Sequence, residues 1–393
     1  QKLVKEFDIM QPVSLADMSA KIFRHHFLRR RIPACGNMLT MAALNSYHGG
    51  KNNVVDGAAP GWHLDITEID ISSAYPFGMS QLPSMSVHRN YKRMKMQRKQ
   101  PRQVEPLGVY KVSGEAFRCD WPVIFQHNFM PIQGPFKDVW VQGFELNEAL
   151  RLEEIHIHKI RGHYYDSDRD SFPSPFASYC AEFYKRKQTE QDPVLRYMYK
   201  IILNSVYGKF IQTHKQSRII YTDVDSGETQ ETHDLIAGGM FHPFIASAIT
   251  AHTRAYIHQV EHAHKAFHTA TDGIFTHYKR IRQVPMAPRS GLGSLEIEAR
   301  GDLVLLRNKC YILYSEDGKT PSQYFKGKHI KKFAKHGFQG TVYDLEEMVA
   351  HNKRRYKASR PNKLRESLKR GLDVNDFVER DYTLKVGPIP VIG

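Results

Sequence analysis

One short stretch of the sequence combines an acid, hydroxyls and an aromatic ring. Asp70 stands between isoleucines in the run Glu68-Ile69-Asp70-Ile71, so on a β-strand the isoleucines would be buried on one face and the carboxylate would point to the other. The chain continues as Ser72-Ser73-Ala74-Tyr75-Pro76, which offers hydroxyls and backbone N–H groups just after the acid. This combination suits a triphosphate with bound Mg²⁺. A strand end with a solvated aspartate is the simpler alternative.

A second segment carries polar side chains along one face of a predicted helix. Their spacing of i, i+4, i+8 and i+11 fits a single helix face, and the residues are Arg196, Lys200, Asn204 and Tyr207. Two cations, an amide and an aromatic ring in this order could contact phosphates and a base or sugar. The alternative is an ordinary amphipathic helix whose polar face is only solvated.

A third segment predicts a tight hairpin. The dipeptide Asp272-Gly273 interrupts a short β-rich run over residues 268–275, and Asp-Gly favours a short turn between two strands. The turn would place Asp272 at the tip of a two-stranded ribbon. By itself the pattern predicts only a turn, so its chemical meaning depends on the other two segments.

In this order, the three segments resemble motifs A, B and C of family B DNA polymerases. The family's D-x-x-S-L-Y-P is matched, with Ala74 in place of Leu, by Asp70, Ser73, Tyr75 and Pro76. Its K-x-x-x-N-S-x-Y-G is matched in full by Lys200, Asn204, Ser205, Tyr207 and Gly208. Its D-T-D-S is matched in part, by Thr271 and Asp272.

Two further elements resemble the protein-primed branch of this family. Its Y-x-G-G element is matched by Tyr47, Gly49 and Gly50, and its K-x-Y element by Lys309 and Tyr311. In the branch, Y-x-G-G follows a 3′–5′ exonuclease domain, and nothing upstream of Tyr47 here could hold that domain's carboxylates. We therefore expect no proofreading in this chain, with a separate exonuclease as a candidate partner.

The resemblance implies an α+β fold of the right-hand polymerase type, with a palm of antiparallel sheet plus helices, fingers formed by a helical pair, and a thumb. We expect an N-terminal segment with the Y-x-G-G element at 1–60, the first part of the palm at 61–165, fingers and a hairpin insertion at 166–240, the second part of the palm at 241–320 and the thumb at 321–393. One interpretation of residues 121–140 is a shortened form of the branch's first insertion.

The activity that the resemblance implies is that of a template-directed DNA polymerase, which adds deoxynucleotides to a primer 3′-end by two-metal-ion nucleotidyl transfer. Asp70 and Asp272 would be catalytic and, with the backbone carbonyl of Ile71, would bind two Mg²⁺ or Mn²⁺ ions. The nucleotide would contact Ile71, Ser72, Ser73, Ala74, Tyr75, Lys187, Arg196, Lys200, Asn204 and Tyr207, with Tyr75 under the sugar. DNA would contact Tyr47, Gly49, Gly50, Lys309 and Tyr311.

One departure from the family pattern leaves a second reading open. Ala270 occupies the position where motif C usually has its first Asp, which removes one negative charge. We expect altered metal dependence rather than loss of activity, because Asp70 and Asp272 remain. The alternative is a degenerate polymerase fold that serves as a DNA-binding or scaffold protein. A third reading, zinc chemistry, comes from the H-x-x-E-H pattern formed by His258, Glu261 and His262.

Composition agrees with a nucleic-acid partner. The 393-residue chain has a formal net charge of +15, with 20 Tyr and 21 Phe that could stack on bases. Seven cations and no acid lie between residues 88 and 103. The predicted thumb is also rich in cations that could follow a DNA backbone, among them Lys326, Lys328, Lys332, Lys353 and Arg354.

The remaining expectations concern partners and location. The partners would be template–primer DNA and dNTP, and the sequence leaves priming open among a terminal protein, an oligonucleotide and no primer. Four scattered cysteines predict a reducing compartment, and no segment is long and apolar enough to predict a membrane partner. We expect the cytoplasm or host-cell interior, with a virus or mobile element as a candidate origin.

Overall fold

The computed structural model describes residues 2–9, 12–54, 61–117, 133–222, 229–281, 290–315, 330–335, 338, 340–351, 355–361 and 377–383. Two sets of predictions fall outside these residues: 121–132 of the predicted insertion, and Lys326, Lys328, Lys353 and Arg354 of the predicted thumb. The chain divides into a first unit, Gln1–Gly49 with Ser72–Tyr256, and a second unit, Gly50–Ile71 with Ile257–Gly393.

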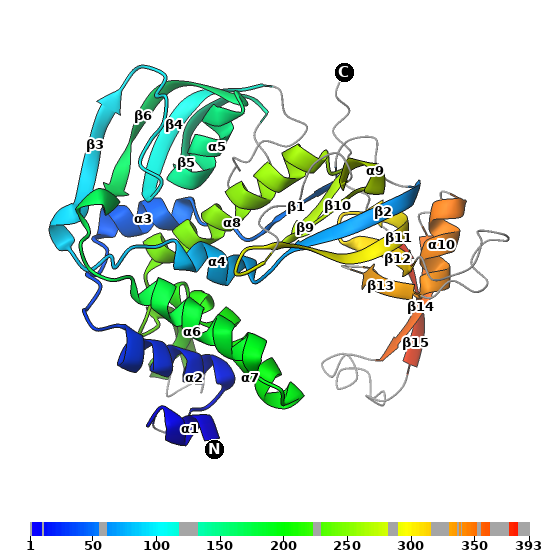
Figure 1. The fold of residues 1–393 in the computed structure, drawn as a ribbon, viewed down its shortest axis with the longest axis horizontal. Coiled ribbons are helices and arrows are strands. Elements are labelled where there is room, and N and C mark those ends of the chain that lie inside the picture. The colour runs from blue at the N-terminus through cyan, green and yellow to red at the C-terminus, as the bar shows by residue number, and fades with distance from the viewer. Residues whose placement is uncertain are drawn as a thin grey trace. The chain divides into compact units, whose positions relative to one another are not determined.

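Seven of the described strands form the antiparallel sheet of the second unit (Figure 1), in the order β1-β9-β10-β2-β11-β12-β13. They are β1 (Lys51–Val54), β2 (Gly61–Ile71), β9 (His268–Thr271), β10 (Gly273–His277), β11 (Leu295–Arg307), β12 (Cys310–Ser315) and β13 (Ile330–Lys335). The hairpin predicted from Asp272-Gly273 is confirmed, because β9 and β10 pair antiparallel on either side of Asp272. The sheet therefore joins strands that are far apart in the sequence.

Strand β11 shows that this sheet is buried on both faces. Leu303 and Leu305 belong to one apolar cluster, whereas the alternating residues Val304 and Leu306 belong to another. The second cluster also takes in α10 (Val342–Ala350) and the hairpin formed by β14 (Arg355–Pro361) and β15 (Phe377–Thr383). Alternation along one strand thus packs it into two separate cores.

The predicted helical pair is present in the first unit as α6 (Pro175–Thr189) and α7 (Pro193–Ser205). Each helix begins with a capping side chain followed by proline: Ser174 accepts a hydrogen bond from the backbone N–H of Ala177 at 3.0 Å, and Asp192 accepts one from Val194 at 2.9 Å. The two helices contact each other, and α2 (Leu15–Ile22) packs on α7. A π-helical turn, Phe23–Phe27, continues α2.

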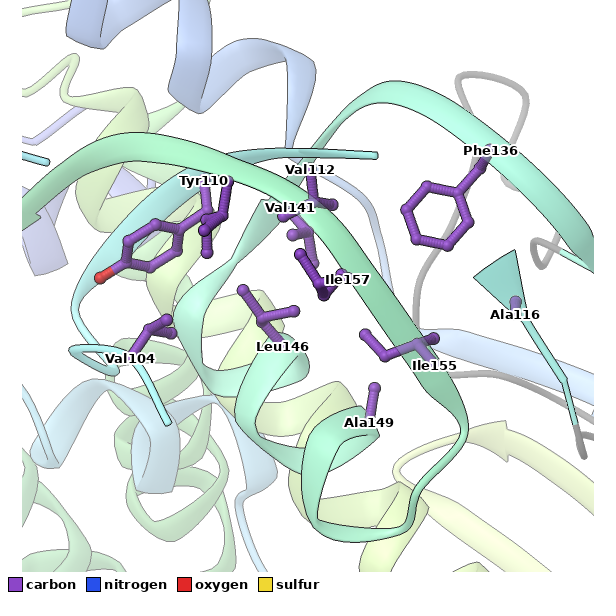
Figure 2. Close-up of a cluster of buried hydrophobic side chains, with 11 residues drawn as sticks. Val104, Tyr110, Val112, Ala116, Phe136, Val141, Leu146, Ala149, Ile155 and Ile157 are labelled. Carbon is purple, nitrogen blue, oxygen red and sulfur yellow. The ribbon is translucent and has the colours of Figure 1, made fainter. Parts of the chain in front are cut away.

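A second, smaller sheet in the first unit has its own core. Four of the described strands lie in the order β3-β6-β4-β5, namely β3 (Tyr91–Gln97), β4 (Gly108–Ala116), β5 (Gly134–Gln142) and β6 (Ile155–Tyr165). Helix α5 (Gly143–Arg151) covers one face, where Leu146 meets Val141 and Ile157 (Figure 2). Alternate residues of each strand reach this core, which explains the burial pattern along β4.

The structure also describes several further helices, strands and turns. In the first unit they are α1 (Lys2–Glu6), α3 (Asn37–Asn45), α4 (Ala74–Ser80) and the antiparallel hairpin of β7 (Thr213–Thr222) and β8 (Thr229–Ala237). Short 3₁₀ turns occur at His88–Asn90, Ser167–Arg169 and Tyr207–Phe210. Helix α9 (Tyr278–Ile281) belongs to the second unit, and α8 (Pro243–His264) contributes residues to both.

The mixture of helices and antiparallel sheets confirms the predicted α+β class. None of the helices in the described ranges is both long enough and apolar enough to cross a membrane.

The core in Figure 2 gives a direct stability prediction. Leu146 is fully buried, so Leu146→Ala should lower the free energy of unfolding by about 2–5 kcal/mol through lost burial and a cavity. Urea denaturation followed by circular dichroism measures the change. Lys159→Ala, at an exposed position of β6, is the control, and equal stability of the two variants would contradict the described packing.

Candidate active site

Strand pairing brings two distant acids together. β2 and β10 are antiparallel with Asp70 opposite Gly273, and the backbone N–H of Ile71 donates to the carbonyl oxygen of Asp272 at 2.9 Å. Asp272 therefore lies in the turn directly beside the end of β2. A Cβ on Gly273 would approach Asp70 Oδ1 to 3.3 Å, so the side chain of Asp70 lies across the glycine.

The two carboxylates lie in a site that is unfavourable for negative charge. Burial raises the pKa of Asp70 most, and the charges of Asp272, Glu298 and Glu68 raise it further, to about 7, against the opposing charge of Lys332. Burial also raises the pKa of Asp272, while its own backbone N–H, Lys332 and Lys309 favour the charged form.

A divalent cation would relieve this repulsion, because carboxylate oxygens are ligands that Mg²⁺ and Mn²⁺ prefer. The donor set of Asp70, Asp272 and the Ile71 carbonyl therefore fits such ions. Within the described ranges, no group of three or more His, Cys, Asp or Glu side chains is close enough to hold a metal ion by itself.

Three charged residues near these acids were not assigned to the site from the sequence. Glu68 precedes Asp70 by two residues on β2, so both acids share a face, and this alternation was the available signal. Glu298 lies where the β11–β2 register shifts between Ile297 and Ala299, and a β-bulge of this kind redirects a side chain. The sequence carries no clear signal for that bulge.

The third residue is Lys332 on β13, which the sequence placed among the cations expected to follow a DNA backbone. Its ammonium donates to Glu68 and, at 3.4 Å, to Glu298. Burial alone would lower the pKa of Lys332, but the hydrogen bond to Glu68 raises this pKa well above its usual value. Burial still raises the pKa of Glu68. One cation therefore offsets part of the charge of the carboxylates.

The motif C turn is fixed from both sides. Thr271 has a φ of 71°, a left-handed conformation that is unfavourable for a β-branched residue. Its hydroxyl donates to Asn52 Oδ1 at 3.0 Å and accepts from Lys309 Nζ at 3.0 Å. Ala270 pairs with Asn52 on one side and with Gly273 on the other, so only small side chains separate Asn52 from Asp70 across the sheet.

Another predicted DNA contact of the second unit, Tyr311, is buried. Tyr311 is 2 % exposed, and its ring packs edge-on against Phe275 at 4.9 Å and His268 at 5.5 Å between ring centroids. The structure therefore brings Asp70, Asp272 and Lys309 close together through Thr271. The Tyr311 ring lies in an apolar cluster, but its hydroxyl is close to Lys332 and Glu68. Burial raises the pKa of Tyr311 most, and the charges of Glu68 and Glu298 raise it further against the charge of Lys332.

Several predicted nucleotide contacts of the first unit also meet. Tyr75 on α4 stacks on Tyr207, with ring centroids 4.5 Å apart and planes within 6°. Lys187 on α6 donates to the hydroxyl of Ser73 at 3.4 Å, and Ser73 adopts a left-handed φ of 53°. Ser72 and Ala74 are buried beside them.

The remaining predicted contacts lie along α7. Arg196 and Lys200 are exposed on the helix, and Asn204 is half-buried and donates to the carbonyl oxygen of Lys200 at 2.9 Å. These three share the predicted helix face, whereas Tyr207 follows the helix end in a 3₁₀ turn.

A buried arginine that the sequence did not single out holds the Y-x-G-G element. Arg254 on α8 is 0 % exposed and pairs through two nitrogens with Glu145 at 2.7 and 2.9 Å. Its third nitrogen donates to the carbonyl oxygens of His48 and, at 2.8 Å, Gly49. A Cβ on Gly49 would meet no atom within 4 Å, so the protein's own packing leaves room beside this glycine.

Comparison with known proteins decides the family. The model for DNA polymerase type B, organellar and viral, matches residues 1–265. The chain belongs to this family. The family resemblance predicted from the motifs is therefore confirmed.

Solved structures of low sequence identity have a fold similar to that of this chain. Phi29 DNA polymerase complexed with primer–template DNA is 16% identical, with a TM-score of 0.69, and the match covers 98% of this chain and 70% of that one. The phi29 enzyme complexed with single-stranded DNA gives 17% identity and a TM-score of 0.67 over the same shares. At such low identity, the likeness establishes the fold. No curated protein matches the sequence.

The zinc reading of His258, Glu261 and His262 does not fit the geometry of the type B polymerase. A buried ammonium, that of Lys51, lies 2.5 Å from His258 Nδ1 and 2.8 Å from Glu261. Burial opposes ionisation of Glu261, yet the charge of Lys51 keeps the pKa of this carboxyl low. His262 is exposed. The cation at this position is therefore a lysine, and its contacts link strand β1 to helix α8.

The Lys332–Glu68 pair gives a testable prediction. Lys332→Met leaves the buried Glu68 carboxylate without its partner, so it should lower the free energy of unfolding by about 1–3 kcal/mol, near the lower end because Lys332 is 40% exposed. Adding Glu68→Gln removes the stranded charge and should restore part of the loss. Urea denaturation compares the variants, and a double variant no more stable than Lys332→Met would contradict the pairing.

Proposed function

We propose that the chain is a template-directed DNA polymerase that extends a primer 3′-end with deoxynucleotides by two-metal-ion nucleotidyl transfer. The observation that carries this proposal is the pair Asp70 and Asp272, two mutually repelling carboxylates in a chain of the type B polymerase family, one on β2 and one in the adjoining β9–β10 turn. Acids held in this way have a high affinity for divalent cations. The residues of motifs A and B, on and beside α4 and α7, would bind the nucleotide.

Asp70, Asp272 and the backbone carbonyl of Ile71 would hold the metal ions. The chemistry supplied by two bound Mg²⁺ or Mn²⁺ ions is activation of the primer 3′-hydroxyl and stabilisation of the leaving pyrophosphate. The protein's own part is to fix the carboxylates. The Ile71–Asp272 backbone hydrogen bond and the bonds of Thr271 to Asn52 and Lys309 limit movement of the turn that carries Asp272.

The triphosphate would be bound by the cations of the helical pair. Lys200, with Arg196 and Lys187, would neutralise its charge, and the hydroxyls and backbone N–H groups of Ser72 and Ser73 would donate hydrogen bonds to its oxygens. Support comes from the contact between Lys187 and the Ser73 hydroxyl, because a phosphate oxygen could replace that hydroxyl as acceptor. The exposed positions of Arg196 and Lys200 leave both free to reach an anion.

Tyr75, Asn204 and Tyr207 would surround the sugar and base. The rings of Tyr75 and Tyr207 are stacked on each other, so a nucleotide could lie between them only if one ring moved. Tyr75 under the sugar would exclude a 2′-hydroxyl. The DNA itself would contact Tyr47, Gly49 and Gly50, and Lys309 and Tyr311 would support the primer terminus.

The competing function is DNA binding without polymerisation, and Ala270 is the observation that favours it. The missing carboxylate reduces the negative charge of the site, but Glu68 and Glu298 add charge close to Asp70. We therefore expect activity with altered metal preference. In a polymerase the acids are needed for primer extension, whereas in a protein that only binds DNA they could affect only DNA affinity. The following variants measure both properties.

Asp70→Ala and Asp272→Ala should each abolish primer extension while leaving the Kd for primer–template DNA within about threefold of wild type, because the acids bind metal rather than phosphate. Extension is measured with Mg²⁺ and with Mn²⁺, and DNA affinity by fluorescence anisotropy. Asp65→Asn, an exposed acid on the same strand, is the matched control. Extension within about tenfold of wild type in either variant would overturn the assignment.

Tyr75→Val should reduce discrimination against ribonucleotides, because a smaller side chain leaves room for the 2′-hydroxyl. A pocket contact of this size commonly supplies about 10- to 200-fold discrimination. The measurement is the ratio of kcat/KM for a matched dNTP and rNTP in single-nucleotide extension. Tyr207→Phe keeps the stacked ring and serves as control. An unchanged ratio in Tyr75→Val would show that Tyr75 does not select the sugar.

A further inference from the structure

A cavity in the first unit lies among residues that none of the polymerase motifs includes. It has a volume of about 480 Å³ and is bordered by the end of the π-helical turn and the residues after it, by the loop after α4, and by the start of α6. Volumes of this size are typical of small-molecule sites. We call it the Arg30 pocket, after the residue whose side chain contacts its aromatic wall.

One half-buried acceptor, Asp170, links two walls of the Arg30 pocket. Asp170 accepts hydrogen bonds from the Ser84 hydroxyl at 2.8 and 2.9 Å, from the backbone N–H of Met85 at 3.0 Å and from that of Phe172 at 3.2 Å. The hydroxyl of Tyr165 donates to the same carboxylate at 2.8 Å. These bonds tie the loop after α4 to the backbone at Phe172, so two walls of the pocket are linked to each other.

The pocket carries the positive charge of two exposed arginines. Arg29 and Arg30 are exposed, and neither forms an ion pair with a carboxylate among the residues that the structure describes. His26 donates from Nε2 to the carbonyl oxygen of Phe7 at 2.7 Å, which fixes the ring beside them. The oxygens of Asp170 are already occupied by their own donors. An anion could therefore neutralise the two arginines.

Aromatic rings give the same pocket an affinity for flat groups. The guanidinium of Arg30 lies 3.9 Å from the centroid of the Phe172 ring, a cation–π arrangement. Phe27 is supported by edge-on contact with Tyr179 at 5.3 Å between centroids. Arginine and aromatic rings together form the platforms on which nucleic-acid bases stack. The flanking turn, Phe23–Phe27, is π-helical, a form that is frequent at functional sites.

We propose that the Arg30 pocket binds a nucleotide, with its phosphate on Arg29 and Arg30 and its base against Phe172. The nucleotide is either free or a residue of single-stranded DNA, since both present the same phosphate and base. This site uses none of the residues assigned to the polymerase reaction. It therefore stands independently of the proposed function, and Asp70→Ala should leave its binding unchanged.

The test uses two variants of the pocket and three probes at fixed salt concentration. Phe172→Leu removes the ring and keeps most of its volume, and Arg29→Ala/Arg30→Ala removes the exposed cations. Lys137→Ala/Lys159→Ala changes the net charge equally at exposed positions of β5 and β6 and is the control. The probes are a short oligothymidylate, an abasic oligonucleotide of the same length, and dTMP, each measured by calorimetry.

Phe172→Leu should weaken oligothymidylate binding by about tenfold and leave abasic binding unchanged, because only the base stacks. The double arginine variant should weaken every probe that binds the wild type, whereas the double lysine control should change affinity less than about twofold. Binding of dTMP identifies a free nucleotide as the ligand. Binding of the oligothymidylate alone identifies single-stranded DNA.

Photocrosslinking gives a local readout. An iodouracil-containing oligonucleotide, or iodo-dUMP if dTMP binds, should crosslink to the peptides that contain Phe27 or Phe172. The proposal is overturned if abasic and thymidine probes bind equally and Phe172→Leu changes neither, or if the crosslinks map only outside the pocket. Circular dichroism confirms that the variants are folded before either outcome is read.

Discussion

The repulsion between carboxylates at the end of β2 is the constraint on which the second unit depends. Antiparallel pairing of β2 with β10 forces Asp70 and Asp272 close together, and burial raises the pKa of both. Lys332 offsets part of the charge through Glu68 and Glu298, but the remaining acids still favour a bound cation. Keeping these acids ionised and close together costs stability, and a bound cation, as the proposed function requires, would reduce that cost.

The backbone near these acids is also held in unfavourable conformations. Positive φ values occur at Ser73 of motif A, Thr271 of motif C and Lys309 of the K-x-Y element. Thr271 is restrained by Asn52 and Lys309, and Ser73 by Lys187. Strain of this kind persists where surrounding contacts impose it, and it concentrates at functional sites. The same hydrogen bonds thus account for the geometry of the turn and for its proposed role.

Local signals in the sequence predicted local structure well. Asp272-Gly273 predicted the hairpin, and the caps and prolines at Asp192-Pro193 mark the break between the two predicted helices. The motifs also predicted that Asp70 and Asp272 would meet. The sequence could not reveal contacts that depend on long-range register, such as the bulge that redirects Glu298 or the pairing that brings Lys332 to Glu68. In the sequence, Lys332 is one of several cations in a basic segment. Only the pairing of β13 with β12 brings it to Glu68.

Template-directed addition is the central claim, and single-nucleotide extension by the unmodified protein tests it most directly. Four primer–templates that differ only in the base opposite the next position are each supplied with one dNTP and Mg²⁺ or Mn²⁺. We expect that only the complementary dNTP is added to each primer and that no addition occurs without a divalent cation. Tight binding of the primer–template with no extension under either metal would contradict it and favour a DNA-binding role.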